Sequence, residues 1–551
     1  MISLSETNRD HATTPYPAHL VSASSTTERR LGGRGAGALA CFAAALGLAL
    51  SAPAAEGAGG PPRPNIILIQ TDDQNVGDLS ARTMPDTKRD LVDHGTTFTH
   101  YVVSTPQCCP SRAELLTGQY SHNNGVVSND AGYPALAGKN DTLPVWLKRA
   151  GYVTAHVGKY LNGYPRFASL EKPAPGWDQW FTLGDHTHYY AYNVGANGHL
   201  IHEGRRPRNY VTNVLTERAL AFVRGHPAGG RPFYLQLDER APHDSNSGVH
   251  PGRCHGSAPV PAPGDRRLFR HAPLPRPPSF NERDVADKPS FISSLPRLDR
   301  HARKSIARDY RCRLASLRSV DRGIGDLVRT LRQTHALGQT VLIFTSDNGF
   351  FTGEHRIRRG KVIPYQQAIR QPLVIRLPRA YRGGPRVRRA PQATANIDLA
   401  PTILELARAR PCARGTICRT LDGRSLVGLL RDDPSGWPAG RGILVEYSGG
   451  AASASRVAGV CRYAGVERRN YTFMEYLSIV PAGQPACQPS DQRELYDLAS
   501  DPDQLSNLYP ASAGSAVAAR EAELESEVST LRDCAGIAGR DPLPASGHYC
   551  E

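Results

Sequence analysis

Two apolar stretches of the chain end in residues whose side chains can hold a cation. The stretches are residues 65–70 and 340–345, and the residues of interest that follow them are Asp72, Asp73, Asp347 and Asn348. Three carboxylates and one amide form an all-oxygen ligand set, which suits Ca²⁺ or Mg²⁺ and offers no soft ligand for zinc. A single Asp-Asp pair is commonly a helix cap or a solvated loop. Because two strands end in acids here, we expect a site for Ca²⁺ or Mg²⁺.

A second group with chemical potential is the segment 108–118, which has the sequence CCPSRAELLTG. A proline at the head of a helix-forming run, followed by Gly118, predicts a loop that leads into a short helix. The amide groups at a helix N-terminus can hold an anion, and Arg112, one turn further in, can add a guanidinium fork to it. A buried cysteine pair at a helix start would give the same spacing, so the spacing alone leaves both interpretations open.

The elements that must position these groups are those of an α/β sheet. Residues 232–237 and 372–376 are further strand candidates. Before the strand at 340–345, apolar residues recur at three- and four-residue steps, which is typical of an amphipathic helix that leads into a parallel strand. These apolar residues are Leu314, Leu317, Val320, Ile324, Leu327 and Leu331. Ligands of such sheets bind at the carboxyl ends of the strands, where the acids would lie.

The composition of the chain changes along its length and indicates three parts. Residues 244–303 are rich in Pro, Arg and Ser and predict a long loop region. From about Gly442, shorter strand-like runs at 442–446 and 471–476 precede a helix near 517–531, which predicts a smaller α+β domain. The expected parts are a leader at 1–60, a catalytic domain at 61–440 and a C-terminal domain at 441–551.

The N-terminal segment has the pattern of a secretory signal. Arg29, Arg30 and Arg34 precede an apolar run at 35–50, and small residues follow it at 51–55. About 15 weakly apolar residues are fewer than the ~20 that span a bilayer. We therefore expect a secreted, extracellular protein without a membrane span in the mature chain. The arginine pair leaves the general and the twin-arginine export routes open.

The eleven cysteines fit an exported protein. Cys41 lies in the signal and Cys108 in the segment described above. Grouping the others by proximity leaves Cys109 over and gives four pairs, which are Cys254 with Cys312, Cys412 with Cys418, Cys461 with Cys487, and Cys534 with Cys550. The sequence does not fix this connectivity, but an oxidising compartment favours disulfides over zinc ligation.

The formal charge of +15 indicates an anionic partner or an Arg-rich composition. The basic residues are scattered and no nucleic-acid-binding motif accompanies them. We therefore expect no nucleic acid among the partners and keep a sulfated polysaccharide as the alternative to a compositional bias.

The segment 108–118 resembles the signature of the sulfatase family, C-x-P-S-R-x-x-x-L-T-G, at every fixed position. The resemblance continues through strings that cover nearly all of the chain after the signal. These strings are at residues 71–74, 158–162, 241–243, 347–349, 353–355, 360–361, 396–402 and 494–498. It implies an alkaline-phosphatase-like fold, in which helices sandwich a large, mixed and mostly parallel sheet next to a smaller α+β domain.

The resemblance also implies the chemistry of the site. In sulfatases, a formylglycine-generating enzyme oxidises the first cysteine of the signature, here Cys108, to formylglycine, whose hydrated aldehyde is the nucleophile. By position, the cation would be held by Asp72, Asp73, Asp347, Asn348 and the modified Cys108. We expect this cation to be Ca²⁺, with Mg²⁺ as the alternative. The resemblance further implies that sulfate and formylglycine are held by Arg112, Lys159 and Lys361. His243 would protonate the leaving oxygen.

The chain departs from the commonest sulfatase pattern at two places. Tyr160-Leu161 replaces a Trp-His pair, so we expect His122 to substitute for the missing histidine, and Gln366 stands where Tyr-Glu is usual. The variant strings resemble N-acetylglucosamine-6-sulfatases and heparan endosulfatases. We therefore expect hydrolysis of sulfate esters on sulfated sugars or aryl sulfates. The alternatives are a phosphonate or phosphate ester hydrolase and a non-catalytic binder of sulfated glycans.

Overall fold

The structure is a computed structural model that describes residues 61–185, 187–245, 254, 256–412, 418–450, 459–481 and 483–551. The expected signal segment lies outside the described residues. No helix in these ranges combines the length and apolarity needed to cross a membrane.

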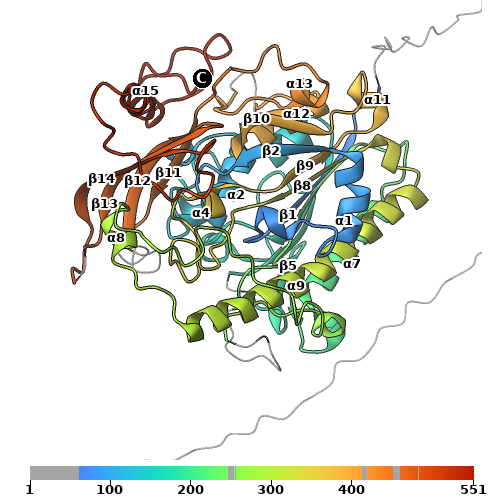
Figure 1. Cartoon of the computed structure of the whole chain (residues 1–551). Coiled ribbons are helices and arrows are strands. Elements are labelled where there is room, and N and C mark those ends of the chain that lie inside the picture. Colours follow the sequence, from blue (N-terminus) through green and yellow to red (C-terminus); the bar gives the residue numbers. More distant parts are fainter. Residues whose placement is uncertain are drawn as a thin grey trace, which may run out of the picture. The chain divides into compact units, whose positions relative to one another are not determined.

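A ten-stranded sheet, with the order β10-β2-β9-β8-β1-β7-β3-β4-β5-β6, forms the centre of the larger part of the chain (Figure 1). Its strands are β1 (Asn65–Thr71), β2 (Thr96–Val102), β3 (Val153–Lys159), β4 (Gln179–Leu183), β5 (Tyr192–Ala196), β6 (His199–Glu203), β7 (Phe233–Asp238), β8 (Thr340–Ser346), β9 (Leu373–Arg376) and β10 (Arg389–Ala395). The run β8-β1-β7-β3-β4 is parallel, as is the pair β10-β2. Strand β9 is antiparallel to both of its neighbours. The prediction of a mixed, mostly parallel sheet is confirmed.

Helices cover both faces of this sheet, which explains why β1 and β8 are buried along their whole length. Alternate side chains of β1 enter separate cores, with Ile66 on one face and Ile67 on the other. Helices α2 and α12 cover the first face, while α7 and α9 cover the second (Figure 1). Residues of α5 also belong to the core of the first face. The bounds of the helices are α1 (Pro85–Asp90), α2 (Cys108–Thr117), α3 (Ser121–Asn124), α4 (Gly132–Ala135), α5 (Leu143–Arg149), α6 (Tyr164–Phe167), α7 (Val211–Arg224), α8 (Ser290–Ser293), α9 (Arg300–Gln333), α10 (Gln366–Ile369), α11 (Arg379–Arg382), α12 (Leu399–Ala407), α13 (Val427–Leu430) and α15 (Ala516–Leu531).

Helix α9 begins earlier than the apolar spacing predicted. It starts at Arg300, so it takes the last residues of the segment expected to be loop. Asp299 caps it, because its side chain accepts a hydrogen bond from the amide of Ala302 at 2.7 Å. The first turns of the helix are largely exposed and therefore carry little apolar periodicity.

The C-terminal part contains an antiparallel sheet of four strands with α15 packed against it. Its strands are β11 (Ile443–Ser448), β12 (Val460–Glu467), β13 (Tyr471–Ile479) and β14 (Gln488–Asp497). The expected α+β element is therefore present, and the domain boundary at residue 441 stays a prediction. The four cysteine pairs grouped by proximity are all disulfides. Cys108 and Cys109 are the free thiols of the described chain.

Candidate active site

The acids expected at a metal site are brought together by the register of two parallel strands. Thr71, the last residue of β1, pairs with Ser346, the last residue of β8, so Asp72 and Asp347 follow side by side. The amide of Asp73 donates to Oδ1 of Asp347 at 3.1 Å. These carboxylates are at most 1% exposed. The sheet edge therefore concentrates negative charge where water cannot screen it.

Asn348 extends this group toward a cation site. Its Nδ2 atom donates to Oδ1 of Asp73 at 2.6 Å. Its Oδ1 atom is buried and has no hydrogen-bond partner among the described residues. An unpaired buried carbonyl oxygen is unfavourable unless a donor or a cation satisfies it.

Cys108 is the first residue of α2, and its side chain points at the acids. Its Sγ atom lies 3.3 Å from Oδ1 of Asp72 and 2.7 Å from Nζ of Lys361. Lys361 also contacts Oδ1 of Asp73. Lys159, at the end of β3, places Nζ 2.6 Å from Oδ2 of Asp72. Two lysines therefore flank the thiol and the paired acids.

Cys109 points away from this group, although it is the next residue in the chain. Its side chain is fully buried in the core that covers one face of the sheet. Its Sγ atom lies 4.0 Å from the carbonyl oxygen of Asn162. Only the first cysteine of the pair therefore contacts the charged groups.

Arg112 joins the ends of three strands. Its Nε and Nη2 atoms lie 3.0 and 2.9 Å from Oδ2 of Asp347, and Nη1 lies 3.1 Å from Oδ1 of Asp238. Nη1 also donates to the carbonyl oxygen of Lys159 at 3.0 Å. The side chain is 1% exposed, so the guanidinium group is fixed by buried, oppositely charged partners.

Asp238 is a site residue that the sequence reasoning missed. It ends β7, the neighbour of β1, and pairs in register with Gln70. His156 bonds its other oxygen through Nε2 at 3.0 Å. The signal was present, because a third apolar strand also ends in an acid. Gly158 permits this packing, since a Cβ atom there would lie 1.8 Å from the carbonyl oxygen of Asp238.

His243 and Arg240 reach the site from the loop after β7. The Nε2 atom of His243 lies 3.8 Å from Oδ2 of Asp73, and Nη1 of Arg240 lies 3.7 Å from Oδ2 of Asp72. The Nδ1 atom of His243 bonds the carbonyl oxygen of Asp244 at 2.9 Å. A carbonyl only accepts, so Nδ1 carries the proton of the neutral ring and Nε2 is free to exchange one. Arg240 was not predicted.

Burial and charge set the protonation states of the site. Burial, and then the charge of Arg240, lower the pKa of His243 to about 3, so the ring is neutral near pH 7. Burial, and then the charge of Asp72, raise the pKa of Cys108 to about 12, so the thiol is neutral. Although burial opposes it, neighbouring basic groups, of which Lys159, Lys361 and Arg112 are charged near pH 7, hold the pKa of Asp72 well below its usual range. A neutral thiol therefore lies among ionised groups.

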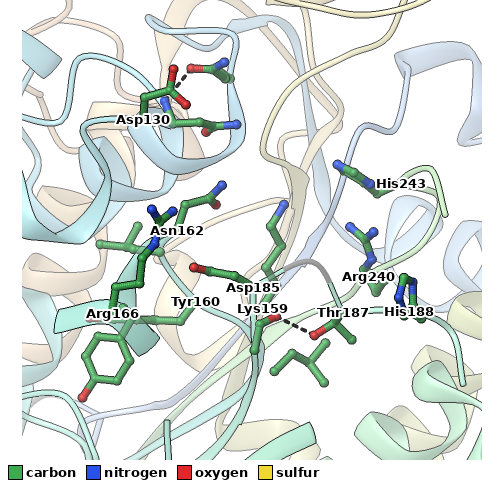
Figure 2. Close-up of a pocket in the computed structure, with 16 residues that line it drawn as sticks. Asp130, Lys159, Tyr160, Asn162, Arg166, Asp185, Thr187, His188, Arg240 and His243 are labelled. Carbon is green, nitrogen blue, oxygen red and sulfur yellow. Dashed lines mark hydrogen bonds between the residues drawn. The ribbon is translucent and has the colours of Figure 1, made fainter. Parts of the chain in front are cut away.

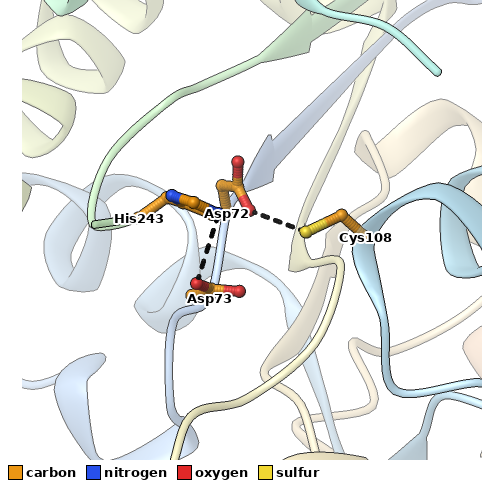
Figure 3. Close-up of side chains that lie close together, drawn as sticks. All are labelled: Asp72, Asp73, Cys108 and His243. Atoms are coloured by element: carbon orange, nitrogen blue, oxygen red, sulfur yellow. Dashed lines mark hydrogen bonds and ion pairs between the residues drawn. The ribbon is translucent and has the colours of Figure 1, made fainter. Parts of the chain in front are cut away.

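One set of ligand atoms is compact enough for a single cation. Atoms of Asp72, Asp73, Cys108 and His243 all lie within 4.8 Å of one another. Figure 3 shows these four side chains converging from the end of β1, the start of α2 and the loop after β7. The oxygens of Asp347 instead accept from the amide of Asp73 and from Arg112. Within and beside this set, the carboxylates of Asp72 and Asp73 and the unpaired Oδ1 atom of Asn348 offer oxygens that suit a hard cation, whereas the thiol of Cys108 and the ring of His243 are softer donors.

A pocket of about 780 Å³ adjoins the charged group. Lys159, Arg240 and His243 line it next to the acids, and Figure 2 shows Asn162 and Arg166 on the side away from His243. Most of the lining side chains are polar or charged. They are Gln107, Asn129, Asp130, Lys159, Tyr160, Asn162, Tyr164, Arg166, Asp185, Thr187, His188, Arg240 and His243. The pocket suits a polar, anionic ligand better than an apolar one.

The structure does not bring His122 to this site. Its Nδ1 atom bonds Oε1 of Glu446 at 2.9 Å, and its Nε2 atom bonds the carbonyl oxygen of Cys534 at 3.0 Å. Both ring nitrogens are thus used in contacts with the C-terminal part of the chain. His122 therefore does not take the place of the missing histidine in this geometry. Gln366 likewise contacts the C-terminal sheet, donating to Oε1 of Glu467 at 3.0 Å.

Comparisons with known proteins agree with this architecture. The family model described as sulfatase matches residues 64–409, and one described as N-sulphoglucosamine sulphohydrolase, C-terminal, matches residues 353–533. An arylsulfatase of Volvox carteri is 32% identical over 511 residues, covering 87% of this chain and 76% of the relative. The human N-acetylglucosamine-6-sulfatase is 30% identical over 489 residues, covering 82% of each.

Two solved structures share the fold at lower identity. One, described as a complex with its substrate D-glucosamine-2-N,6-O-disulfate, has a TM-score of 0.66 and 23% identity, covering 85% of this chain and 97% of the other. A phosphonate monoester hydrolase of Agrobacterium radiobacter has a TM-score of 0.64 and 20% identity, covering 88% and 99%. From the family match and the curated relatives, the chain belongs to the sulfatase family and is a sulfuric ester hydrolase.

Proposed function

We propose that this sulfatase hydrolyses sulfate esters of sulfated sugars and aryl sulfates with a formylglycine made from Cys108 and a bound Ca²⁺. The proposal rests on the position of the Cys108 side chain. The Cys108 side chain, at the N-terminus of α2, lies within 3.3 Å of both Asp72 and Lys361. Cys109 contacts none of these groups and packs in the core instead. The position of the Cys108 side chain therefore supports Cys108, and not Cys109, as the modified residue.

The charged side chains around Cys108 have distinct roles in this proposal. When formed, formylglycine supplies a hydrated aldehyde with one hydroxyl to attack sulfur and a second to release sulfate. Lys159 and Lys361 lie where they can neutralise charge on the sulfate oxygens. Arg112 presents a fixed positive charge beside them, since Asp238 and Asp347 hold its guanidinium group in place. His243 would protonate the leaving oxygen through Nε2, after that atom has taken up the proton that the attacking hydroxyl loses.

The oxygen-rich set beside Cys108 fits Ca²⁺, with Mg²⁺ as the alternative. Asp72, Asp73 and Asn348 would hold the ion, together with Asp347 after a shift of its contacts with Arg112. When bound, the ion supplies positive charge to the sulfate group and to the modified residue. The unpaired Oδ1 atom of Asn348 supports this assignment most directly.

The sugar substrate is supported by the polar pocket and by the relatives. The lining offers both acidic and basic side chains, which suit hydroxyl, amino and sulfate groups of a sugar. The human relative is named for a sulfated amino sugar. We also propose export by the N-terminal signal and maturation by a formylglycine-generating enzyme. Relatives of Caenorhabditis elegans and Drosophila melanogaster are named as extracellular sulfatases.

Peptide mass spectrometry tests the central step. In protein from its native host, the peptide that contains Cys108 should lose about 18 Da, the change from thiol to aldehyde. The same spectrum should show an unchanged residue at Cys109. An unmodified Cys108 in fully active enzyme would contradict the proposal.

A further inference from the structure

A second pocket, of about 600 Å³, is lined mainly by arginines and lies outside the site described above. Its arginines come from the end of β9, from α11 and from the segment that leads into β10. They are Arg376, Arg379, Arg382, Arg386 and Arg388. His94, from the segment before β2, also lines the pocket, and burial and then the charge of Arg376 lower its pKa, so its ring is neutral near pH 7. Like charges this close together repel one another, so a carboxylate or an anionic ligand would stabilise the group.

These arginines have no carboxylate partner within the described chain. The nearby acids form ion pairs with other basic residues. Asp90 pairs with Arg89 and Arg332, and Asp93 pairs with Lys88. Arg376 instead donates to the carbonyl oxygen of Asp90 at 2.9 Å.

The electrostatics of the cluster also indicate missing negative charge. The Nε atom of Arg382 is buried and has no hydrogen-bond partner among the described residues. Burial, and then the charge of Arg332, lower the pKa of Arg376, a direction that an adjacent anion would reverse.

The pocket lies at the edge of the sheet opposite to the active site. Strand β9 is antiparallel to β8, so Arg376 at its end pairs with Leu342 near the start of β8. Leu337 and Gly338, which precede β8, also line the pocket. The acids of the active site follow the other end of β8. Seven residues of strand separate the two edges, which is roughly 20 Å, so one sugar unit cannot occupy both sites.

The lining residues fit the sulfate groups of a polysaccharide better than the bases of a nucleic acid. A guanidinium group binds sulfate or carboxylate through paired hydrogen bonds. The described lining contains no Phe, Trp or Tyr on which a nucleic acid base could stack. None of the large exposed apolar side chains of the described chain lies in it.

We propose that the arginine pocket is a second binding site for the sulfate groups of a polysaccharide chain. It is separate from the active site, and its choice of ligand rests on the proposed action on sulfated sugars. A polymer held there would be retained near the enzyme between cleavage events. The hydrolysis of a small aryl sulfate would not depend on the arginine pocket, since this substrate occupies only the active site.

Binding to immobilised heparin tests the proposal in the full chain carrying Cys108→Ala, which prevents hydrolysis. Arg379→Gln, Arg382→Gln and Arg388→Gln are combined in one variant. A control combines Arg205→Gln, Arg224→Gln and Arg267→Gln, which are exposed, lie elsewhere and remove the same charge. We expect the pocket variant to raise Kd by about tenfold or more, with a weaker salt dependence, and the control to raise it by less than about threefold. Equal losses in both variants would overturn the proposal.

Two further arms identify the ligand. Inorganic sulfate at the same total sulfate concentration should displace heparin poorly, and duplex DNA of equal charge should bind more weakly. Efficient displacement by the free ion, or equal binding of DNA, would overturn the assignment to a sulfated polysaccharide. In the active enzyme, the pocket variant should raise KM for a sulfated polymer and leave kcat/KM for an aryl sulfate unchanged. Heparin binding by a protein without any sulfatase activity would refute the proposed function and leave this site standing.

Discussion

The Nζ atom of Lys361 lies 2.7 Å from the Sγ atom of Cys108, although 253 positions separate the two residues in the chain. Lys361 also contacts Asp73, and Cys108 contacts Asp72. A single lysine therefore links the cysteine at the start of α2 to the acids at the end of β1. This arrangement places positive charge beside the atom that the proposed chemistry modifies.

The two neighbouring cysteines should respond differently to substitution. Cys108→Ala should lower kcat/KM for an aryl sulfate by at least about 10³-fold, because it removes the proposed nucleophile. Cys109→Ala is the matched control, since that side chain packs in the core and lies 4.0 Å from the carbonyl oxygen of Asn162. It should retain a substantial fraction of the activity. The reverse pattern in steady-state assays would refute the assignment.

Arg112→Lys should lower kcat by about 10²–10³-fold. Lysine keeps the charge but cannot contact Asp347 and Asp238 together, as the guanidinium group does. Thermal unfolding must be measured in parallel, because disturbing a buried ion pair also destabilises the fold. A variant with both normal Tm and normal kcat would show that the paired contacts do not matter for turnover.

Removal of divalent cations should inactivate the enzyme reversibly. After treatment with EDTA, Ca²⁺ should restore activity more fully than Mg²⁺, and zinc should not restore it, because the proposed ligands all offer oxygens; they are Asp72, Asp73, Asp347 and Asn348. Asn348→Leu, which removes the unpaired Oδ1 atom, should raise the Ca²⁺ concentration needed for half-maximal recovery. Ca²⁺ should also raise Tm, since it binds the folded state. An EDTA-treated enzyme with full activity would argue against a required cation.

His122 should contribute to stability in a pH-dependent way. Burial opposes its charge, but Glu446 raises the pKa of His122 to about 9 in the folded state, compared with about 6.5 when unfolded. A raised pKa means that the stabilisation is fully present below about pH 6.5 and is lost as pH rises through about 9. The difference in unfolding free energy between wild type and His122→Gln should therefore shrink from pH 6 to pH 9.5.

Urea unfolding at several pH values measures this difference. The full effect is of the order of 3 kcal/mol or less. The activity of His122→Gln on an aryl sulfate at pH 6 serves as the control. It should remain close to that of wild type, since the His122 ring bonds Glu446 and the carbonyl oxygen of Cys534 and does not contact the active site. A large fall in kcat without a change in stability would instead support the substitute role expected from the sequence.

The sequence by itself determined the class of the protein and predicted the main parts of its site. The apolar runs that become β1 and β8, the acids after them and the Cys108–Gly118 segment were all readable, because strand burial and helix starts are local properties of the chain. It also separated Cys108 from Cys109 by position in the signature. The four cysteine pairs were grouped correctly because the partners lie close in sequence.

Only the tertiary structure decided which groups meet. Asp238 and Arg240 enter the site because β7 pairs with β1, and strand order cannot be read from local periodicity. His122 lies outside the site because α3 packs against the C-terminal part, where its two ring nitrogens bond Glu446 and the carbonyl oxygen of Cys534. The arginine pocket forms because β9 runs antiparallel to β8. Each outcome depends on contacts between residues distant in sequence, whose geometry is fixed by sheet register and packing rather than by neighbouring residues.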